Sequence, residues 1–390
     1  MAGRAGPPVA SGSLAALVAL GLLVVAPAAG LAVDEPVGVV GEPATAAATA
    51  VRMGVPERRL TIAFTGDTLP HSPLVRRALV NGGGVVHDFA PMFAAVEPVL
   101  SSFDLAICHL ETPVAPPGEP LSEFPVYGVP ASIATAIAGA GYDRCSTASN
   151  HTNDRGVRGI DATVDALEAA GVAQSGMART PDEAVADVFE VDGIHLAHLS
   201  YTYGMNSSRL PAGESWRTNL IDPARIVADA LDARERGARL VVVSLHWGVE
   251  GTSMLSGQQR AVAQAVTASG AVDLIVGHHA HVLQPIEMVN GRWVIYGLGN
   301  FLSNMPTGAF PMPQSQDGAI AVATVLEWPD GRLAIDTPTI LPTWVDRRNG
   351  WVVRSVLDEV DVAGIDPALR QALLGSLWRT ARLLGPFIGP

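Results

Sequence analysis

The chain has 390 residues, of which 48% are hydrophobic and only 16% are charged, and its formal net charge is −13. This length and apolar content allow one large core or two smaller ones. So negative a protein gains nothing from the counterion release that drives binding to DNA or RNA, which excludes nucleic acid as an expected partner.

Residues 1–32 have the order of a secretory signal. Arg4 precedes an apolar stretch from Leu14 to Val25, and small residues such as Ala28 and Ala32 follow. An apolar core of about a dozen residues is short for a membrane span, which favours a cleaved signal peptide over the alternative, a retained N-terminal anchor. We therefore expect an exported protein, extracellular or in the cell envelope. Residues 33–59, which are rich in Ala, Val, Pro and Gly, are expected to be a linker.

From Leu60 onward, short aliphatic runs typical of buried strands are followed by polar residues of the kinds that bind metals. One strand that ends in Asp or His means little, but five such strands are hard to explain by packing alone. In chain order the runs and the residues after them are Leu60–Phe64 with Asp67, Phe103–Ile107 with His109 and Glu111, Cys145–Ala148 with Asn150 and His151, Leu240–Leu245 with His246, and Asp273–Val276 with His278, His279 and His281.

The position of these polar residues predicts a shared site. Open α/β sheets carry their chemistry beyond the carboxyl ends of the strands. His279 and His281 can both turn into one pocket if the loop after Gly277 curls. Carboxylate and amide oxygens together with imidazoles suit Mn, Fe, Zn or Mg. The expected cofactor is thus a divalent metal, as one ion or two.

Helical segments alternate with these strands, an α/β pattern. Asp161–Ala170 and Pro223–Arg236 are examples, each followed by a glycine that can end a helix. Near the end of the chain, Thr337–Val353 is expected to form a hairpin, and Ile365–Leu384 a helix with an apolar stripe. We expect residues 346–390 to pack on the main domain.

The two cysteines, Cys108 and Cys145, lie on predicted buried strands. An even number of cysteines in an exported protein favours a disulfide. Neighbouring strands of a parallel sheet, however, rarely present the short Cβ separation that a bridge needs. We therefore expect two buried free thiols, with a disulfide as the alternative.

Other polar residues near the motifs have ordinary explanations. His71 follows Asp67 closely and is expected to support the site rather than bind metal. Asp154 is either a helix N-cap or a residue that acts on the substrate or on its neighbours. His195 and His198 are expected to be ordinary surface or core residues, and His278 to bond the backbone.

Several motifs occur together in the chain. They are Phe64-Thr65-Gly66-Asp67, Leu110-Glu111, Ser149-Asn150-His151 with Asp154 and Gly156, Tyr201-Thr202-Tyr203-Gly204-Met205-Asn206, His246-Trp247-Gly248, Gly277-x-His279-x-His281-Val282 and Tyr296-Gly297-Leu298-Gly299-Asn300-Phe301. Their order resembles that of the CapA family. CapA proteins are associated with bacterial capsule or poly-γ-glutamate synthesis, and their domain resembles the calcineurin-like metallophosphoesterases. The resemblance covers roughly Leu60 to Pro342, and it implies a CapA-like domain at residues 60–345.

The resemblance implies a fold and a role for each motif residue. The fold is a four-layer αββα sandwich with mixed sheets. Three departures from the family pattern leave the number of metals open. Leu69 stands where phosphoesterases have a ligand His, His109 stands where CapA sequences commonly have Asn, and no Asp follows Gly66-Asp67 at the spacing of a Gly-Asp-x-x-Asp motif. The implied metal ligands are Asp67, Glu111, Asn150, His246, His279 and His281, and the implied catalytic residues are His151, as an acid, and Asp154.

Two classes of function follow. The chain is either a metal-dependent hydrolase, acting on a phosphoester or on an anionic polymer such as poly-γ-glutamate, or a non-catalytic accessory protein of polymer assembly, and a membrane-bound polymer synthase complex is the expected partner. An anionic substrate needs local positive charge, which divalent cations supply. Arg155, Arg158 and Arg179 are expected to help.

Overall fold

The larger of two sheets is built around the long strand β1 (Arg58–Leu69) in the structure, a computed structural model that describes residues 55–206, 209–305 and 312–389. Its other strands are β2 (Leu105–Leu110), β3 (Arg144–Ser146), β4 (Ala173–Ser175), β11 (Asn300–Ser303), β12 (Asp317–Glu327), β13 (Leu333–Ile335), β14 (Thr339–Asp346) and β15 (Val352–Ser355). They are ordered β15-β14-β12-β1-β2-β3-β4, with β11 beside β1 and β13 beside β12. β1 runs parallel to β2 and antiparallel to β12, so the sheet is mixed.

The smaller sheet is mixed as well. It consists of β5 (Val188–Val191), β6 (Ile194–Thr202), β7 (Leu240–His246), β8 (Leu274–His278), β9 (Ile286–Val289) and β10 (Arg292–Ile295). The order is β5-β6-β7-β8-β10-β9, in which the four inner strands are parallel and the two edge strands antiparallel. In both sheets, therefore, neighbouring parallel strands place their carboxyl ends at the same edge.

The two sheets face each other across an aliphatic core. Ile62 of β1 and Ile107 of β2 lie in one buried cluster with Val242 of β7 and Val276 of β8. Side chains alternate along a strand, so the residues between these point to the outer faces. There they pack on helices: one cluster joins the larger sheet to Leu74 and other helical residues, and a second joins the smaller sheet to helices on its far side.

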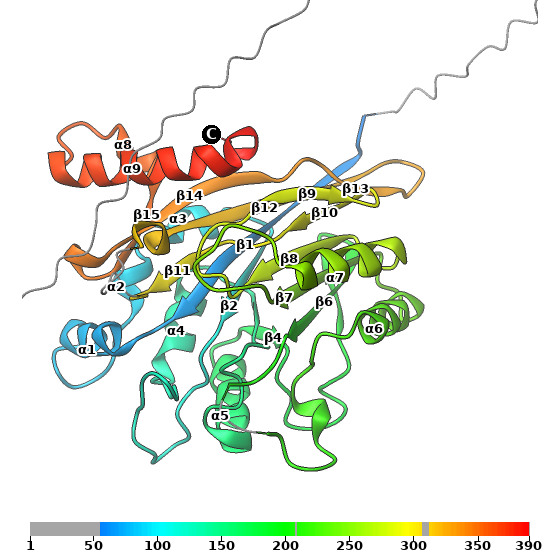
Figure 1. The fold of residues 1–390 in the computed structure, drawn as a ribbon, viewed down its shortest axis with the longest axis horizontal. Coiled ribbons are helices and arrows are strands. Elements are labelled where there is room, and N and C mark those ends of the chain that lie inside the picture. The colour runs from blue at the N-terminus through cyan, green and yellow to red at the C-terminus, as the bar shows by residue number, and fades with distance from the viewer. Residues whose placement is uncertain (1–54, 207–208, 306–311, 390) are drawn as a thin grey trace, which may run out of the picture. The chain divides into compact units, whose positions relative to one another are not determined.

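Figure 1 shows these helices on the two outer sides of the sheets. The larger sheet is covered by α1 (Ser72–Asn81), α2 (Ala90–Phe93), α3 (Glu97–Leu100), α4 (Ser132–Gly139) and α5 (Gly156–Ala169), and the smaller by α6 (Pro223–Glu235) and α7 (Gly257–Ala268). Short 3₁₀ turns occur at Ser215–Arg217, Pro313–Gln316, Arg347–Asn349 and Gly385–Phe387. The expected four-layer αββα arrangement with mixed sheets is confirmed.

The C-terminal elements also agree with the sequence. Strands β14 and β15 pair antiparallel as a hairpin, and α8 (Val356–Val360) and α9 (Pro367–Leu384) follow. Leu373 of α9 is buried against Trp344 of β14, so the terminal helix packs on the sheet through its apolar stripe. Asp366 caps α9 by accepting hydrogen bonds from two backbone amides of its first turn.

The expectation of free thiols is wrong. β2 and β3 are neighbours in a register that places Cys108 directly beside Cys145, and both side chains point to the helix-covered face. Their Cα atoms are 4.4 Å apart, and the two residues form a disulfide. This distance is within the range of roughly 4.4–6.8 Å that a bridge tolerates. The argument that such bridges are rare between parallel strands does not hold for this pair.

The described residues bear on only part of the predicted domain organisation. Residues 53–390 form one compact unit. The signal or anchor predicted at 1–32, and nearly all of the linker predicted at 33–59, lie outside the described residues, so both stay predictions. Within the described ranges, no helix combines the length and the hydropathy that crossing a bilayer requires.

Candidate metal centre

Asp67, Glu111 and His281 form one half of a buried cluster at the carboxyl ends of the strands. Asp67 ends the regular part of β1, where the pairing with β2 shifts register, and Glu111 directly follows β2. Nδ1 of His281 lies 3.1 Å from Oδ2 of Asp67, and Nε2 of the same ring lies 3.6 Å from Oε1 of Glu111. The imidazole therefore stands between two carboxylates, with one ring nitrogen facing each.

Glu111 also belongs to the other half of the cluster, with Asn150, His246 and His279. Nε2 of His246 lies 3.9 Å from Oε1 of Glu111 and 3.1 Å from Oδ1 of Asn150. Ligand-type atoms of Glu111, His246 and His279 all lie within 4.8 Å of one another. The structure thus brings together all the residues that the sequence indicated as ligands, with Glu111 shared between the two halves.

The loop after β8 has the tight curl that the sequence argument required. His279 and His281 both have positive φ, 87° and 55°, a region that residues with a side chain seldom adopt. Gly277 precedes them, and a Cβ atom added to this residue would stand only 1.9 Å from the carbonyl oxygen of Tyr296. Such strain persists only where surrounding structure enforces it, and it is typical of functional sites.

The electrostatics of the cluster fit a cation. Burial would raise the pKa of Asp67, but its contacts with His278 and His281 outweigh burial and hold that pKa well below its usual range. Burial raises the pKa of Glu111 to about 7, against the attraction of His281. Burial would lower the pKa of His281, yet the charges of Glu111 and Asp67 raise it to about 10. The two carboxylates thus draw positive charge to this point, which a proton on His281 supplies in the structure and a bound cation would supply in place of that proton.

Several atoms of the cluster that could bind a metal ion have no hydrogen-bond partner. They are both carboxylate oxygens of Glu111 and Nδ1 of His279, and all are buried. Buried carboxylate oxygens without donors are costly. Burial also lowers the pKa of His279 to about 3, so this ring is neutral and offers a lone pair. Unpaired oxygens beside a neutral imidazole are the donor set that divalent cations of the Mn, Fe and Zn type prefer.

Two further histidines belong to the cluster. β8 continues through His278, one residue beyond the strand end expected at Gly277. Nδ1 of His278 lies 3.3 Å from Oδ1 of Asp67. The interpretation of His278 as a backbone partner is therefore wrong. His109 stacks on His278 with ring centres 4.1 Å apart. The sequence did contain an indication that His109 belongs to the site: it lies two residues before Glu111, and residues two apart on an extended strand share one face.

His151 and Asp154 lie next to these residues and form a dyad. Nδ1 of His151 is 2.6 Å from Oδ2 of Asp154, which also accepts a hydrogen bond from the backbone amide of Tyr127. The ring of Tyr127 contacts the His151 ring edge to face. Helix α5 begins at Gly156 with Arg155 as its N-cap residue, so the N-cap interpretation of Asp154 is wrong and its role is to hold His151.

The loop after β6 supplies a wall of the site. The Tyr203 ring lies 4.6 Å from the His279 ring, and its hydroxyl is 3.5 Å from Nδ2 of Asn150. The amide of Asn206 donates to the carbonyl oxygen of Asn150. Tyr201 instead packs in the core, with its hydroxyl on Asp229. Tyr203 and Asn206 are thus the exposed motif residues of this loop that lie beside candidate ligands.

His71, His195 and His198 lie outside the groups of metal-binding type. His71 places Nδ1 2.9 Å from the carbonyl oxygen of Leu69, and burial lowers its pKa to about 4. His198 is buried and bonds Ser244, whereas His195 is exposed. Glu250, which the sequence did not single out, is exposed and lies close to His279 and His281.

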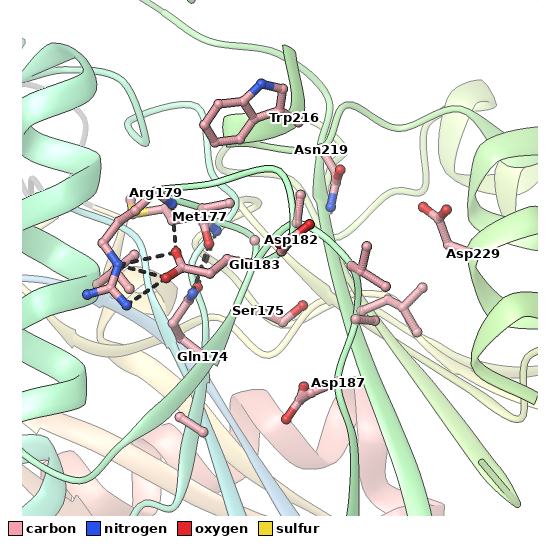
Figure 2. Close-up of a pocket in the computed structure, with 18 of the residues that line it drawn as sticks. Gln174, Ser175, Met177, Arg179, Asp182, Glu183, Asp187, Trp216, Asn219 and Asp229 are labelled. Carbon is pink, nitrogen blue, oxygen red and sulfur yellow. Dashed lines mark hydrogen bonds and ion pairs between the residues drawn. The ribbon is translucent and has the colours of Figure 1, made fainter. Parts of the chain in front are cut away.

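The three arginines expected to help an anionic substrate are all paired with carboxylates. Arg155 and Arg158 both contact Glu119, and Arg179 contacts Glu183, Asp165 and Glu168. Each of the three therefore has a carboxylate partner in the structure, and their help to an anionic substrate stays a prediction. Arg179 lines a cavity of about 810 Å³ that contains none of the candidate ligands. Figure 2 shows its ion pair with Glu183 on the wall of this cavity.

The site can now be compared with known proteins. Residues 61–305 match the family model described as bacterial capsule synthesis protein PGA_cap. The chain is 32% identical over 171 residues to the capsule biosynthesis protein CapA of Bacillus anthracis, covering 43% of this chain and 41% of that protein. It is 28% identical over 215 residues to a probable polyglutamine synthesis accessory protein of Mycobacterium tuberculosis, covering 52% of this chain and 56% of that one. The matches thus span about two fifths to somewhat over half of these curated relatives.

Solved structures give a remote likeness of fold. The NAD nucleotidase of Haemophilus influenzae matches with a TM-score of 0.46 and 12% identity, over 85% of this chain and 57% of that chain. The calcineurin-like phosphoesterase YfkN of Bacillus subtilis matches with a TM-score of 0.43 and 13% identity, over 83% of this chain and 98% of that one. Likenesses this remote say nothing about activity. The family model, which spans well over half of the sequence and contains every candidate ligand, shows that the chain belongs to the bacterial capsule synthesis protein PGA_cap family, to which the CapA motifs pointed.

Proposed function

We propose that this chain is an exported, metal-dependent protein of capsule or poly-γ-glutamate synthesis or processing, with a hydrolase-type site. The observation that supports it best is Glu111, whose two buried oxygens have no hydrogen-bond partner and whose Oε1 faces both His246 and His281. Asp67, Glu111 and His281 would hold one divalent cation, and Glu111, Asn150, His246 and His279 a second. When bound, such a cation polarises a scissile group and lowers the pKa of a water molecule.

The protein's own residues would supply the proton transfer. Asp154 accepts from Nδ1 of His151 and so directs Nε2 of that ring away from the carboxylate. A protonated His151 would donate from Nε2 to the leaving oxygen, the role of a general acid. Tyr203 is partly exposed beside His279 and would border the bound substrate.

The substrate we propose is an anionic polymer or a phosphoester, and the partner is a membrane-bound polymer synthase complex. The names of the relatives support the polymer: one is a capsule biosynthesis protein, and another is a probable polyglutamine synthesis accessory protein. The −13 net charge of the chain would repel such a substrate, and the proposed cations would supply the local attraction. Export follows from the signal-like order of residues 1–32.

The test begins with metal analysis of the purified chain, followed by incubation with a chromogenic phosphodiester and with poly-γ-glutamate. We expect bound divalent metal and chelator-sensitive cleavage, which His151→Ala abolishes while metal content stays unchanged. His195→Ala is the matched control, because this exposed histidine lies on β6 and contacts none of the candidate ligands. A chain that binds metal and its polymer without turnover would be an accessory protein, and a chain that binds no metal would refute the proposal.

A further inference from the structure

A line of hydrogen bonds runs behind the candidate ligands from β3 to the loop that carries Asn150. Oγ of Ser146 lies 2.8 Å from Nδ1 of His109, and Nε2 of His109 lies 2.9 Å from Nδ1 of His246. Nε2 of His246 then lies 3.1 Å from Oδ1 of Asn150. All of these side chains are buried. Two imidazole rings thus connect a hydroxyl group to a ligand amide.

Each neutral imidazole carries one proton, so one ring nitrogen donates and the other accepts. Nε2 of His109 faces Nδ1 of His246 at 2.9 Å, so one of these two nitrogens carries the proton between them and the other accepts it. In one direction, Ser146 donates to His109, His109 donates from Nε2 to His246, and His246 donates from Nε2 to Asn150. This direction satisfies every link when no cation is present.

The opposite direction is also available. The hydroxyl of Ser146 can donate to the carbonyl oxygen of Cys108, 3.3 Å away, and then accepts from Nδ1 of His109. His246 in turn donates from Nδ1 to His109. Its Nε2 is then a bare lone pair that faces Oδ1 of Asn150 and Oε1 of Glu111. Three acceptors converge in this state, and a cation between them would satisfy all three.

We propose that Ser146 and His109 are positioning residues that set which nitrogen of His246 carries its proton, and that the line reverses when Nε2 of His246 binds a divalent cation. The proton count does not change, because each imidazole holds one proton before and after. The cation displaces the proton of Nε2 of His246 to solvent, the proton between the rings moves from Nε2 of His109 to Nδ1 of His246, and Ser146 gives its hydroxyl proton to Nδ1 of His109. Ser146 takes up one proton from solvent in exchange, and its hydroxyl then points to the carbonyl oxygen of Cys108. The inference rests on the proposed function, since it assigns the two directions to the metal-free and metal-bound states.

His109 acts through His246 rather than as a ligand. It can be grouped with Asp67 and His278 as a set of metal-binding type. Both of its ring nitrogens, however, already face partners, namely Ser146 and His246. Its ring also lies nearly parallel to that of His278, with an interplanar angle of 14°, which fixes the ring plane. Binding a metal would require His109 to leave one of these partners.

The experiment compares Ser146→Ala with Ser244→Ala. Ser244 is the matched control, because its Oγ lies 2.9 Å from Nε2 of His198 in another buried Ser–His pair, and His198 belongs to none of the candidate ligand groups. Zinc affinity is measured by calorimetry, unfolding of the metal-free variants by thermal melting, and the protonated nitrogen of His246 by ¹⁵N NMR without and with zinc.

In the parent chain we expect the proton of His246 on Nε2 without zinc and on Nδ1 with zinc. Ser146→Ala leaves Nδ1–H of His109 without an acceptor in the reversed line, so zinc affinity should fall by about 10- to 100-fold, the usual effect of losing such a supporting partner. Ser244→Ala should bind zinc like the parent. His109→Gln, whose amide oxygen can accept from His246, should keep more affinity than His109→Leu.

Each alternative result has a distinct meaning. If the parent binds zinc and Ser146→Ala binds it equally well, or if the proton of His246 stays on the same nitrogen, the inference is refuted while the proposed function stands. If the parent binds no divalent metal, both are refuted. If Ser146→Ala melts far below Ser244→Ala without metal, a purely structural role replaces the positioning role.

Discussion

Nδ1 of His151 lies 2.6 Å from Oδ2 of Asp154, three residues further along the chain, and neither side chain is substantially exposed. Within one short loop, Asp154 thus fixes the orientation of the His151 ring beside the candidate metal ligands. We expect His151→Ala to lower any hydrolytic turnover by about 10²- to 10⁴-fold, the usual contribution of a general acid. Asp154→Asn should also lower turnover, because it weakens the group that orients the ring.

Both dyad variants should keep their metal, which elemental analysis checks beside steady-state kinetics. Asp165→Asn is a suitable control, since Asp165 is an exposed partner of Arg179. Loss of metal together with activity in His151→Ala would show that this ring is a ligand instead of an acid.

His279→Ala should lower the amount of bound metal. The ring of His279 is neutral, its Nδ1 has no partner, and it is grouped with Glu111 and His246. His278→Ala should have a smaller effect, a fall in affinity of about tenfold, because His278 acts on the metal through Asp67. Elemental analysis and calorimetry measure both. Equal metal content in His279→Ala and the parent would contradict the assignment of this ligand.

The stability of the chelated protein should depend on Glu111. The native pKa of about 7 lies above the ordinary value of 4.5, so ionisation of Glu111 opposes folding. Its cost is absent below about pH 4.5, grows as pH rises and is complete above pH 7, when it reaches on the order of 3 kcal/mol. Glu111→Gln cannot ionise and should therefore become more stable than the parent across this range.

Urea unfolding of both proteins in chelator, at several pH values, measures the difference. With saturating divalent metal the order should reverse, because Gln offers no carboxylate to the cation. If the free energies of unfolding of parent and variant in chelator changed in parallel with pH, ionisation of Glu111 would not oppose folding.

Replacing both cysteines, in the variant Cys108→Ala/Cys145→Ala, should lower the free energy of unfolding. The bridge closes a loop with a sequence separation of 37. The chain-entropy relation gives about 4 kcal/mol for a loop of this size. Urea unfolding measures the change, and alkylation of the denatured parent without reductant checks the bridge itself. Two free thiols in the parent would contradict it.

The sequence was sufficient to indicate the candidate ligands because strand ends can be located from composition. Aliphatic runs before Asp67, Glu111 and His246 became β1, β2 and β7. The parallel pairing of β1 and β2 puts Asp67 and Glu111 at one edge of the larger sheet, while His246 ends β7 of the smaller sheet. The curl of the loop at His279 and His281 was stated as a condition, and their positive φ angles meet it.

Contacts between strands were harder to predict, because they depend on register. Nothing local to Cys108 or Cys145 indicates that β2 and β3 align them side by side. His109 reaches His246 only because two sheets meet at that point. The composition around Asp154 was equally compatible with an N-cap, and the start of α5 at Gly156 decided the matter.

The distribution of the cluster along the chain has a consequence for biosynthesis. Asp67 lies on the first strand, whereas His281 follows β8 and touches Asn300 of β11. Synthesis delivers the first of these long before the last, so no partial product can hold a cation as the finished protein would. Metal loading would therefore come at the end of folding, and a metal-loaded molecule would be one whose chain had already folded completely.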